Sequence, residues 1–333
     1  MTARWRMATL SAYAPAVPVG CAPSQVTRMD RRSFIASVGA GASLLGLPSQ
    51  AMETPPQHSP VMLSRAIARS GERLPVIGMG TSGTFDIGAD AAARAALIEV
   101  TRLLLENPKA VIDTAPSYGR AELVSGDILH EQGWRKQAFL ATKISAPAGP
   151  AARAQWQQSQ QALRSTTVDL LQIHNLVDWR NNLRFLQELK ASAQVRYVGI
   201  THYLDHAHDT LADIVAAEVV DFVQINLSVV SRAAERRLLP LCQDRGVAVI
   251  INRAFEDGRL FSQVKGRALP DWANEIDCRS WAQLFLKFVI AHPAVTVVIP
   301  ATSKPTNMRD NLGAGSGALP DAGQRARIAA LFA

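Results

Sequence analysis

The chain has 333 residues, of which 48% are hydrophobic, 19% charged and 6% aromatic. This composition is typical of a globular protein with apolar material for one large or two medium domains, and it excludes disordered, collagen-like and disulfide-rich chains. The formal charge is +7, but residues 1–51 hold five arginines against one aspartate and contribute +4 of it. The remaining charge is too small to indicate nucleic acid as a partner.

The three cysteines, Cys21, Cys242 and Cys278, lie far apart in the sequence. They have none of the paired spacings that zinc sites or redox-active dithiols need. We therefore expect no metal site in this protein.

Residues 1–51 are interpreted as a leader that precedes the folded part. Arg31 and Arg32 stand directly before a weakly apolar run, residues 34–47, that is rich in Ala, Gly and Ser. This pattern resembles a twin-arginine export signal at about residues 29–51, with small residues at 49–51 for cleavage. A run of about 14 residues is too short to span a hydrocarbon core, which needs about 20. We therefore expect export to the periplasm by the twin-arginine machinery, with no membrane anchor left after cleavage.

Two alternatives stay open for this region. If the leader is not functional, the protein stays in the cytoplasm. Residues 1–28 precede the usual start of such a signal, so translation can begin at Met29 instead of Met1. Residues 52–62 are assigned to a linker and residues 63–333 to the folded domain.

From residue 63 onward, short β-branched runs alternate with longer segments of helical spacing. Runs at 64–68 and 74–78 flank a Ser-Gly-Glu-Arg turn and predict a hairpin. Eight further runs are mostly apolar on both faces, as in parallel strands that are covered by helices. These strands are expected at residues 76–80, 110–113, 138–143, 170–174, 195–201, 222–226, 247–252 and 295–300. The helices between them are expected at residues 91–105, 121–132, 152–166, 182–193, 208–217, 234–245 and 280–292.

Eight β-then-α units in about 250 residues match an α/β protein of the (β/α)8 TIM barrel type, with the N-terminal hairpin capping its bottom. A doubly wound open sheet is the competing fold, because residues 78–83 fit the G-x-G-x-x-G dinucleotide motif. That motif should open a helix at once, yet the next helix is expected only near Asp90. The acidic residue expected at a strand end about 20 residues on is also missing. We therefore predict the barrel.

Catalytic groups of such barrels sit at the carboxyl ends of the strands, and four reactive side chains occur there. Asp113 ends the second strand and Tyr118 follows it, Lys143 ends the third strand, and His174 ends the fourth. Lys143 can stabilise the phenolate of Tyr118 and so lower its pKa, while Asp113 holds the ammonium in place. A neutral His174 can hydrogen-bond the oxygen of a substrate carbonyl. This set holds an acid but no reductant, which a cofactor must supply.

These residues resemble the aldo-keto reductase family over about residues 63–315. The matching pieces are Asp-Thr-Ala-x-x-Tyr-Gly at 113–119, Thr-Lys at 142–143 and Gln-Ile-His at 172–174, in the family's order and on its strands. The resemblance implies reversible, NAD(P)H-dependent reduction of a small aldehyde or ketone, with Tyr118 as general acid. Two rival hypotheses stay open, a Schiff-base lyase that uses Lys143 and a non-catalytic sensor or partner subunit that binds a nicotinamide nucleotide.

The resemblance also implies a cofactor site at the ends of the first, fifth, sixth and seventh strands. Family members hold the nicotinamide carboxamide with a Ser-Asn pair and a Gln, and many stack a Tyr under the ring. Here His202 replaces the Asn, and Asn252 and Arg253 stand where the Tyr is expected, so a polar or guanidinium contact has to replace the stacked ring. The residues expected to contact this end of the cofactor are Gly80, Thr81, Thr201, His202, Gln224, Asn252 and Arg253.

The phosphate and adenine end of the cofactor is expected after the eighth strand. Ala301 and Asn307 stand where many members have basic residues, so Lys304 is the residue of this segment expected to pair with a 2′-phosphate. NADP is the first choice of cofactor, and NAD is left open. The contacts expected in this segment are Thr302, Lys304, Asp310 and Asn311.

Overall fold

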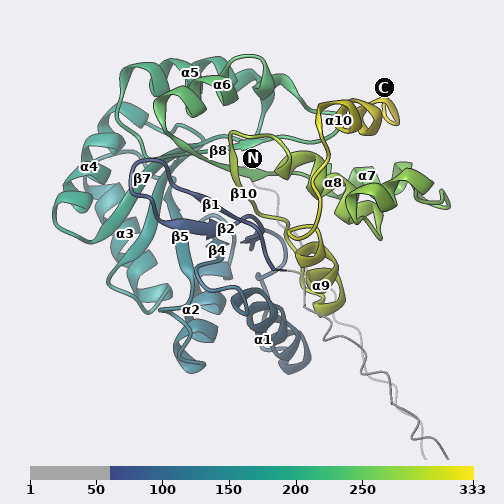
Figure 1. The fold of residues 1–333 in the computed structure, drawn as a ribbon. Coiled ribbons are helices and arrows are strands. Elements are labelled where there is room, and N and C mark those ends of the chain that lie inside the picture. Colours follow the sequence, from purple (N-terminus) through teal and green to yellow (C-terminus); the bar gives the residue numbers. More distant parts are fainter. Residues whose placement is uncertain (1–60) are drawn as a thin grey trace, which may run out of the picture. The chain divides into compact units, whose positions relative to one another are not determined.

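The computed structural model describes residues 61–333, so the twin-arginine motif lies outside the described residues. Eight parallel strands form one sheet, with the helices around it (Figure 1). The strands pair in chain order from β3 (Met79–Gly80) to β10 (Val295–Val298). Two parallel bridges, Ile77 with Val298 and Gly80 with Ala301, join the first strand to the last. The predicted (β/α)8 barrel is confirmed.

The remaining strands of the barrel are β4 (Val111–Asp113), β5 (Phe139–Ile144), β6 (Val168–His174), β7 (Val195–Thr201), β8 (Phe222–Asn226) and β9 (Ala248–Asn252). The α-helices are α1 (Ala91–Leu105), α2 (Ala121–Glu131), α3 (Pro150–Ala162), α4 (Trp179–Ala191), α5 (His208–Ala217), α6 (Leu238–Arg245), α7 (Arg259–Gln263), α8 (Trp281–Ile290), α9 (Pro305–Gly313) and α10 (Ala322–Ala330). The 3₁₀ helices in residues 61–333 are η1 (Asp205–Ala207), η2 (Ala233–Glu235), η3 (Glu256–Gly258) and η4 (Asp271–Ile276).

Local sequence explains where several helices begin and end. Asp90 caps α1, since its carboxylate accepts from the backbone N–H groups of the first turn at 2.8 and 3.0 Å. The prediction that a helix extends to residue 166 is wrong, because α3 ends at Ala162 and Arg164 adopts a left-handed φ of 47°. The segment expected as one helix over 234–245 is divided into η2 and α6.

The glycine motif at residues 78–83 is part of the barrel, and the open-sheet alternative is wrong. A Cβ atom on Gly78 would lie 2.8 Å from the backbone oxygen of Val111, so glycine is needed where the chain passes β4. Gly83 lies in a turn, and no helix follows until Ala91. The glycines therefore serve close packing and turn geometry and do not open a helix, as a dinucleotide-binding motif would.

The hairpin of β1 (Ser64–Ala66) and β2 (Arg73–Pro75) caps the bottom of the barrel, as predicted (Figure 1). Ile67 and Leu74 of the hairpin are fully buried in a cluster with residues at the amino ends of the strands. The strand residues of this cluster include Val111, Phe139, Leu170, Tyr197 and Phe222.

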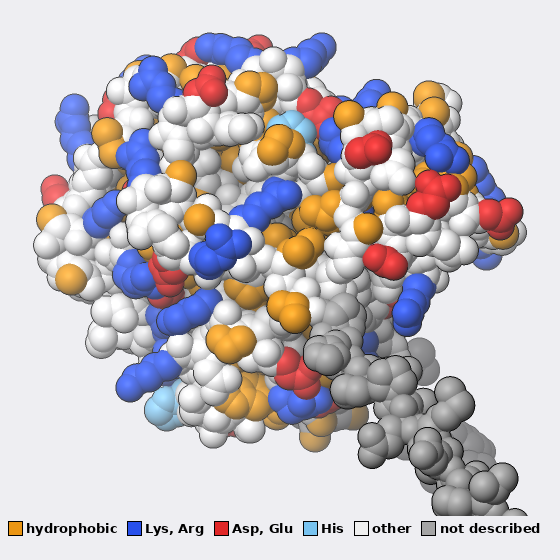
Figure 2. Space-filling model, in the orientation of Figure 1, with side chains coloured by type: hydrophobic (Ala, Val, Ile, Leu, Met, Phe, Trp, Pro, Cys, Tyr) orange, Lys and Arg blue, Asp and Glu red, His pale blue; other side chains and the backbone are white. Residues whose placement is uncertain are grey.

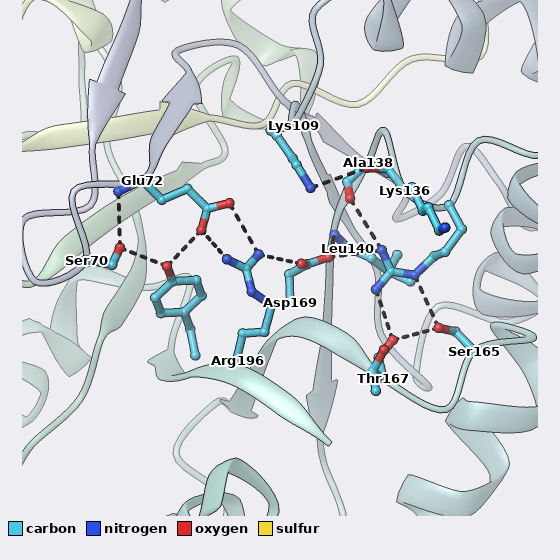
Figure 3. Close-up of polar contacts among 12 residues, drawn as sticks. Ser70, Glu72, Lys109, Lys136, Ala138, Leu140, Ser165, Thr167, Asp169 and Arg196 are labelled. Atoms are coloured by element: carbon cyan, nitrogen blue, oxygen red, sulfur yellow. Dashed lines mark hydrogen bonds and ion pairs between the residues drawn. The ribbon is translucent and has the colours of Figure 1, made fainter. Parts of the chain in front are cut away.

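Polar contacts also tie the hairpin turn to the barrel (Figure 3). Arg196 of β7 pairs with Glu72 in the turn at 2.5 Å and with Asp169 of β6 at 2.8 Å. The hydroxyl of Tyr197 donates to the same Glu72 carboxylate at 2.8 Å. The apolar cluster and this network close the amino end of the barrel, which leaves its carboxyl end for a ligand.

The surface on the hairpin side carries charges of both signs. Lys and Arg side chains are scattered over this face, with acidic side chains among them (Figure 2). Within residues 61–333, no helix combines the length and the apolar character needed to cross a membrane.

Candidate active site

A cavity of about 770 Å³ lies at the carboxyl end of the barrel. This volume falls in the range of small-molecule and cofactor pockets, about 300–1,000 Å³. Residues that follow seven of the eight strands line it. The residues predicted from the sequence that line the cavity are Gly80, Thr81, Asp113, Tyr118, His174, Thr201, Gln224, Asn252 and Arg253.

Lys143 and Asp113 form a buried ion pair beside this cavity. The Lys143 Nζ atom lies 2.6 Å from Asp113 Oδ2, and the two side chains are 0% and 3% exposed. The ammonium also donates to the backbone oxygen of Thr114 at 2.8 Å. Burial alone would lower the pKa of Lys143, but Asp113 and Tyr118 outweigh it and the net pKa is raised. Lys143 is therefore a fixed cation.

Two amides complete the surroundings of the Asp113 carboxylate. Gln224 Nε2 donates to Asp113 Oδ1 at 2.8 Å, and Gln172 Nε2 donates to the same oxygen at 3.2 Å. The hydroxyl of Thr201 donates to Gln224 Oε1 at 3.0 Å. Gln224, predicted as a cofactor contact, thus also orients the carboxylate that holds Lys143.

Tyr118 lies between this cation and the cavity. The Lys143 Nζ atom is 5.0 Å from the centroid of the Tyr118 ring. Burial raises the pKa of Tyr118, Lys143 opposes this rise and Asp113 adds to it, so the net pKa lies above its ordinary value. The expectation of a lowered pKa is therefore wrong in sign, since burial outweighs the ammonium. The phenol stays protonated at neutral pH and is available as a proton donor.

His174 presents an uncharged imidazole to the same cavity. Burial, followed by the charges of Lys143 and His202, lowers the pKa of His174 to about 4. Its ring packs edge-on against Tyr118, with the centroids 5.8 Å apart and an interplanar angle of 86°. Ser117 Oγ lies 3.3 Å from His174 Nδ1. If the hydroxyl donates to Nδ1, the proton of the neutral ring is on Nε2, where it can be donated to a carbonyl oxygen.

The turn that presents Tyr118 depends on the glycine after it. Gly119 has a φ of +60°, and a Cβ atom there would collide with the Asp86 carboxylate. Asp86 accepts a hydrogen bond from the backbone N–H of Arg120 at 3.0 Å. Only glycine fits this position, which explains the Tyr-Gly pair in the sequence.

His202 follows β7 beside the cavity, although its side chain is not part of the lining. Its Nδ1 atom accepts from the backbone N–H of Leu204 at 3.2 Å, and its ring stacks on Tyr203 with an interplanar angle of 8°. Burial, followed by the charges of His206 and His208, lowers its pKa. A neutral His202 therefore carries its proton on Nε2 and offers one donor, where an asparagine would offer a donor and an acceptor.

Arg253 and Asn252 replace the stacked tyrosine that the family resemblance led us to expect. Arg253 pairs with Asp257 at 2.6 Å and donates to the backbone oxygen of Tyr203 at 3.3 Å. The Arg253 Nε and Asn252 Oδ1 atoms are buried and have no hydrogen-bond partner within the described residues. Two orphaned polar atoms in the cavity wall fit the amide and hydroxyl groups of a polar ligand such as a nicotinamide nucleotide.

The residues predicted to bind the phosphate and adenine lie outside the cavity lining. Thr302 is buried, and its hydroxyl accepts from the backbone N–H of Lys304 at 3.1 Å. Asp310 accepts from Ser280 Oγ at 2.8 Å and from Gln283 Nε2 at 2.9 Å, which ties α9 to α8. Asn311 is buried in α9. The structure thus brings the residues predicted to be catalytic together with the predicted contacts of the nicotinamide end, except His202. The segment predicted to bind the phosphate and adenine lies apart from them.

Sequence reasoning missed several residues of the cavity wall. The missed residues are Ser82, Thr84, Ser117, Asn175, Tyr203, Ala254, Phe255, Asp257, Gly258, Phe261, Ile299, Pro300 and Ala301. Most of them follow a strand end by only a few positions, so a wider search after each strand would have found them. Phe261 lies in α7, which had no predicted segment.

Comparisons with known proteins identify relatives of this chain. A sequence profile of the Aldo/keto reductase family matches residues 76–331. The chain is 28% identical over 204 residues to aldo-keto reductase YhdN of Bacillus subtilis, a match that covers 56% of this chain and 60% of that protein. It is 26% identical over 196 residues to the NADH-specific methylglyoxal reductase of Escherichia coli, covering 49% of this chain and 58% of the relative.

Solved structures show the same fold. An aldo/keto reductase from Klebsiella pneumoniae, in complex with NADP and acetate, superimposes with a TM-score of 0.67 at 24% identity, over 80% of this chain and 94% of that one. The holo form of an aldo-keto reductase from Bacillus halodurans gives a TM-score of 0.66 at 22% identity, over 81% and 96% of the two chains.

Proposed function

Because the chain belongs to the aldo/keto reductase family and is an NAD(P)-dependent oxidoreductase, we propose that it reduces a small aldehyde or ketone to an alcohol, reversibly, with Tyr118 as the proton donor. One observation carries this proposal. A protonated phenol, Tyr118, lies in the cavity wall in contact with both a buried cation, Lys143, and a neutral imidazole, His174. This is the arrangement needed to protonate a carbonyl oxygen.

Each side chain has a separate part in the reaction. NAD(P)H, when bound, supplies the hydride for the carbonyl carbon. His174 donates a hydrogen bond that orients the carbonyl oxygen, and Tyr118 gives that oxygen its phenolic proton. The ammonium of Lys143 stabilises the phenolate that forms, and Asp113 keeps the ammonium in place. Water returns a proton to Tyr118 afterwards.

NADP is the proposed cofactor. Support comes from the likeness to reductases solved with NADP, and the name of the Escherichia coli relative keeps NADH as the alternative. Thr201, Gln224, Asn252 and Arg253 would hold the nicotinamide end, because they line the same cavity as Tyr118 and His174. Lys304 is the cation proposed for the 2′-phosphate.

The geometry speaks against a Schiff-base lyase. Lys143 would have to lose its proton to attack a carbonyl, but its pKa is raised and its side chain is fully buried against Asp113. Borohydride trapping of a carbonyl compound on Lys143 would nevertheless establish the lyase, so this control belongs in the test.

The direct test follows the absorbance of NADPH or NADH with a panel of small aldehydes and ketones. Consumption of reduced cofactor with matching formation of alcohol supports the proposed function. Tight nucleotide binding without reduction of any carbonyl compound favours a non-catalytic sensor or partner subunit instead.

We further propose that the protein is exported folded to the periplasm by the twin-arginine machinery. The support is the Arg31-Arg32 pair before the weakly apolar run. Fractionation of cells that produce the wild type and the R31K/R32K double variant tests this. Periplasmic wild-type protein and cytoplasmic variant are expected, whereas cytoplasmic location of both contradicts export.

A further inference from the structure

A second cavity, here called the amino-end groove, lies at the end of the barrel that the hairpin covers. Its volume is about 330 Å³, at the lower end of the range of small-molecule pockets. It is bounded by the hairpin, the loop from α6 to β9 and the loop from α8 to β10, where β1 and β10 lie side by side (Figure 1). The two cavities share no lining residue, so a ligand in the groove would be separate from substrate and cofactor. The residues that line the groove are Ser64, Arg65, Ala66, Ala68, Arg73, Cys242, Gln243, Gly246, Val247, Ala248, Pro293, Ala294, Val295 and Thr296.

The lining of the amino-end groove is positively charged. It contains Arg65 and Arg73 and no acidic residue. Arg69 and Arg245 stand next to lining residues in the sequence, and Arg69 donates to the backbone oxygen of Arg245 at 3.4 Å. Within residues 61–333, none of these four arginines forms an ion pair with a carboxylate. The groove therefore presents cationic charge that the described part of the chain does not neutralise.

Arg65 is a partly buried cation that is held by uncharged oxygen atoms. Its guanidinium donates to the backbone oxygens of Ile290 at 2.5 Å and His292 at 2.7 Å, and also to that of Val295. These bonds fix the guanidinium between the end of α8 and the start of β10, and they leave N–H groups over, since a guanidinium has five. Burial lowers the pKa of Arg65, and no acidic group among the described residues opposes this effect.

Other cations at this end of the barrel do have carboxylate partners. Arg196 pairs with Glu72 and Asp169, and Lys190 pairs with Asp221 at 2.6 Å. Burial alone would lower the pKa of Arg196, but Glu72 and Asp169 outweigh it and the net pKa is raised. Because a partly buried charge without a partner is unfavourable, an anion bound in the groove would supply the counter-charge that the chain provides elsewhere.

The polar groups of the lining that remain unused are hydrogen-bond donors. Arg73 Nε donates to Ser64 Oγ at 2.9 Å, and its other nitrogens contact no side chain. The hydroxyl of Thr296, which is 5% exposed, accepts from the backbone N–H of Val249 at 3.0 Å. Within the described residues, the Ser64 and Thr296 hydroxyls each accept a bond and donate none. Together with the free N–H groups of Arg65, these donors match the charged oxygens of a phosphate group.

We propose that the amino-end groove binds a phosphate group, with Arg65 and Arg73 as counter-charges and the hydroxyls of Ser64 and Thr296 as further donors. The phosphate group is carried either by a small soluble anion or by a lipid headgroup, which share this chemistry. A phosphate offers more acceptor oxygens than a carboxylate does, which suits donors that come from the hairpin and from β10. The site does not depend on the proposed function, because it lies apart from the candidate active site.

Calorimetric titration of the full-length protein with sodium phosphate tests binding of a soluble anion. Excess NADP is present so that the cofactor site is filled, and sodium chloride keeps the ionic strength constant. Saturable binding at one site per chain is expected if the ligand is soluble. Sedimentation with vesicles of phosphatidylglycerol, compared with vesicles of phosphatidylcholine, tests the lipid headgroup. Binding to the phosphatidylglycerol vesicles alone assigns the site to a headgroup.

Two variants change the groove at exposed positions, so the fold should persist in both. Arg73→Gln removes one cation, and Ala66→Glu places a carboxylate opposite Arg73, its partner across the hairpin. Each is expected to raise the Kd for phosphate, or for the vesicles, about tenfold, the effect of one charged hydrogen bond. Arg184→Gln removes an exposed arginine that lines neither cavity, and this matched control should leave Kd within twofold. Thermal unfolding confirms that each variant is folded.

The outcomes are distinct. Binding that is weakened by Arg73→Gln and Ala66→Glu, and not by Arg184→Gln, supports the proposal and its location. Equal weakening in all three variants shows general attraction of anions to a positively charged protein and overturns it. Unchanged binding in Arg73→Gln and Ala66→Glu overturns it as well. So does the absence of binding to both the vesicles and phosphate at concentrations up to about 10 mM.

Discussion

The ammonium of Lys143 lies 2.6 Å from the carboxylate of Asp113 in a region that solvent hardly reaches. Gln224 and Gln172 donate to the other carboxylate oxygen, so the pair is held from four strands of the barrel. Because a buried cation needs its partner, stability and catalysis depend on the same contact.

Asp113→Asn leaves Lys143 buried without a counter-charge. The free energy of unfolding is expected to fall by about 3–5 kcal/mol, because the folded protein must either keep the unpaired Lys143 ammonium buried or deprotonate it, and both are unfavourable. Urea denaturation measures this. Glu188→Gln, which breaks the exposed pair with Arg153, is the control and should cost at most about 1 kcal/mol. A loss in Asp113→Asn no larger than in the control contradicts the buried-pair account.

Titration of His174 is expected to make the free energy of unfolding depend on pH in the acid range. Its folded-state pKa of about 4 lies below the ordinary 6.5, so the unfolded chain binds a proton more readily and stability falls as pH decreases from 6.5 to 4. The loss from this one group is expected to be about 2 kcal/mol after allowance for partial exposure. Urea denaturation at both pH values, for the wild type and His174→Gln, measures it. The same pH dependence in both proteins would show that His174 does not titrate as described.

Ser117→Ala removes the hydroxyl that faces His174 Nδ1. We expect kcat/KM for the best aldehyde to fall severalfold, because the imidazole loses the contact that keeps its proton on Nε2. Nitrogen NMR of the labelled imidazole reports the tautomer directly, and Ser117→Thr should restore both readouts. Ser82→Ala, which removes a hydroxyl without a contact to His174, is the control. A wild-type ring protonated on Nδ1 contradicts this role for Ser117.

Lys304→Ala tests the proposed phosphate contact. Lys304 is exposed at the start of α9, whereas Arg309 in the same helix is paired with Glu99 at 2.9 Å. The Kd for NADPH is expected to rise about tenfold and that for NADH to stay unchanged, since only NADPH carries the 2′-phosphate. Fluorescence titration measures both constants, with Arg309→Ala as the control. Equal changes in Kd for NADPH and NADH would show that Lys304 does not contact the 2′-phosphate.

The clustering of the four site residues was predictable from the sequence, because a barrel places the carboxyl ends of all its strands at one rim. Asp113, Tyr118, Lys143 and His174 each occur where an apolar run stops, and a simple topological rule brings them together. Asp90 was also predictable as a helix start, because its capping contacts lie within three residues.

Long-range partners were not predictable from the sequence. Burial raises the pKa of Tyr118 more than Lys143 lowers it. That burial comes from packing by many elements, so the net direction of the pKa cannot be predicted from the sequence. Asp310 accepts hydrogen bonds from Ser280 and Gln283, about 30 residues earlier in the chain, and no local sequence pattern predicts these partners.

The central claim is that the phenol of Tyr118 donates the proton to the substrate oxygen. Tyr118→Phe keeps the ring and removes the proton, so single-turnover reduction of the best aldehyde, with reduced cofactor already bound, isolates this step. We predict a loss of at least about 100-fold in the reduction rate, the usual scale of general acid catalysis, with unchanged Kd for the cofactor. Reduction by Tyr118→Phe at the wild-type rate would contradict the account.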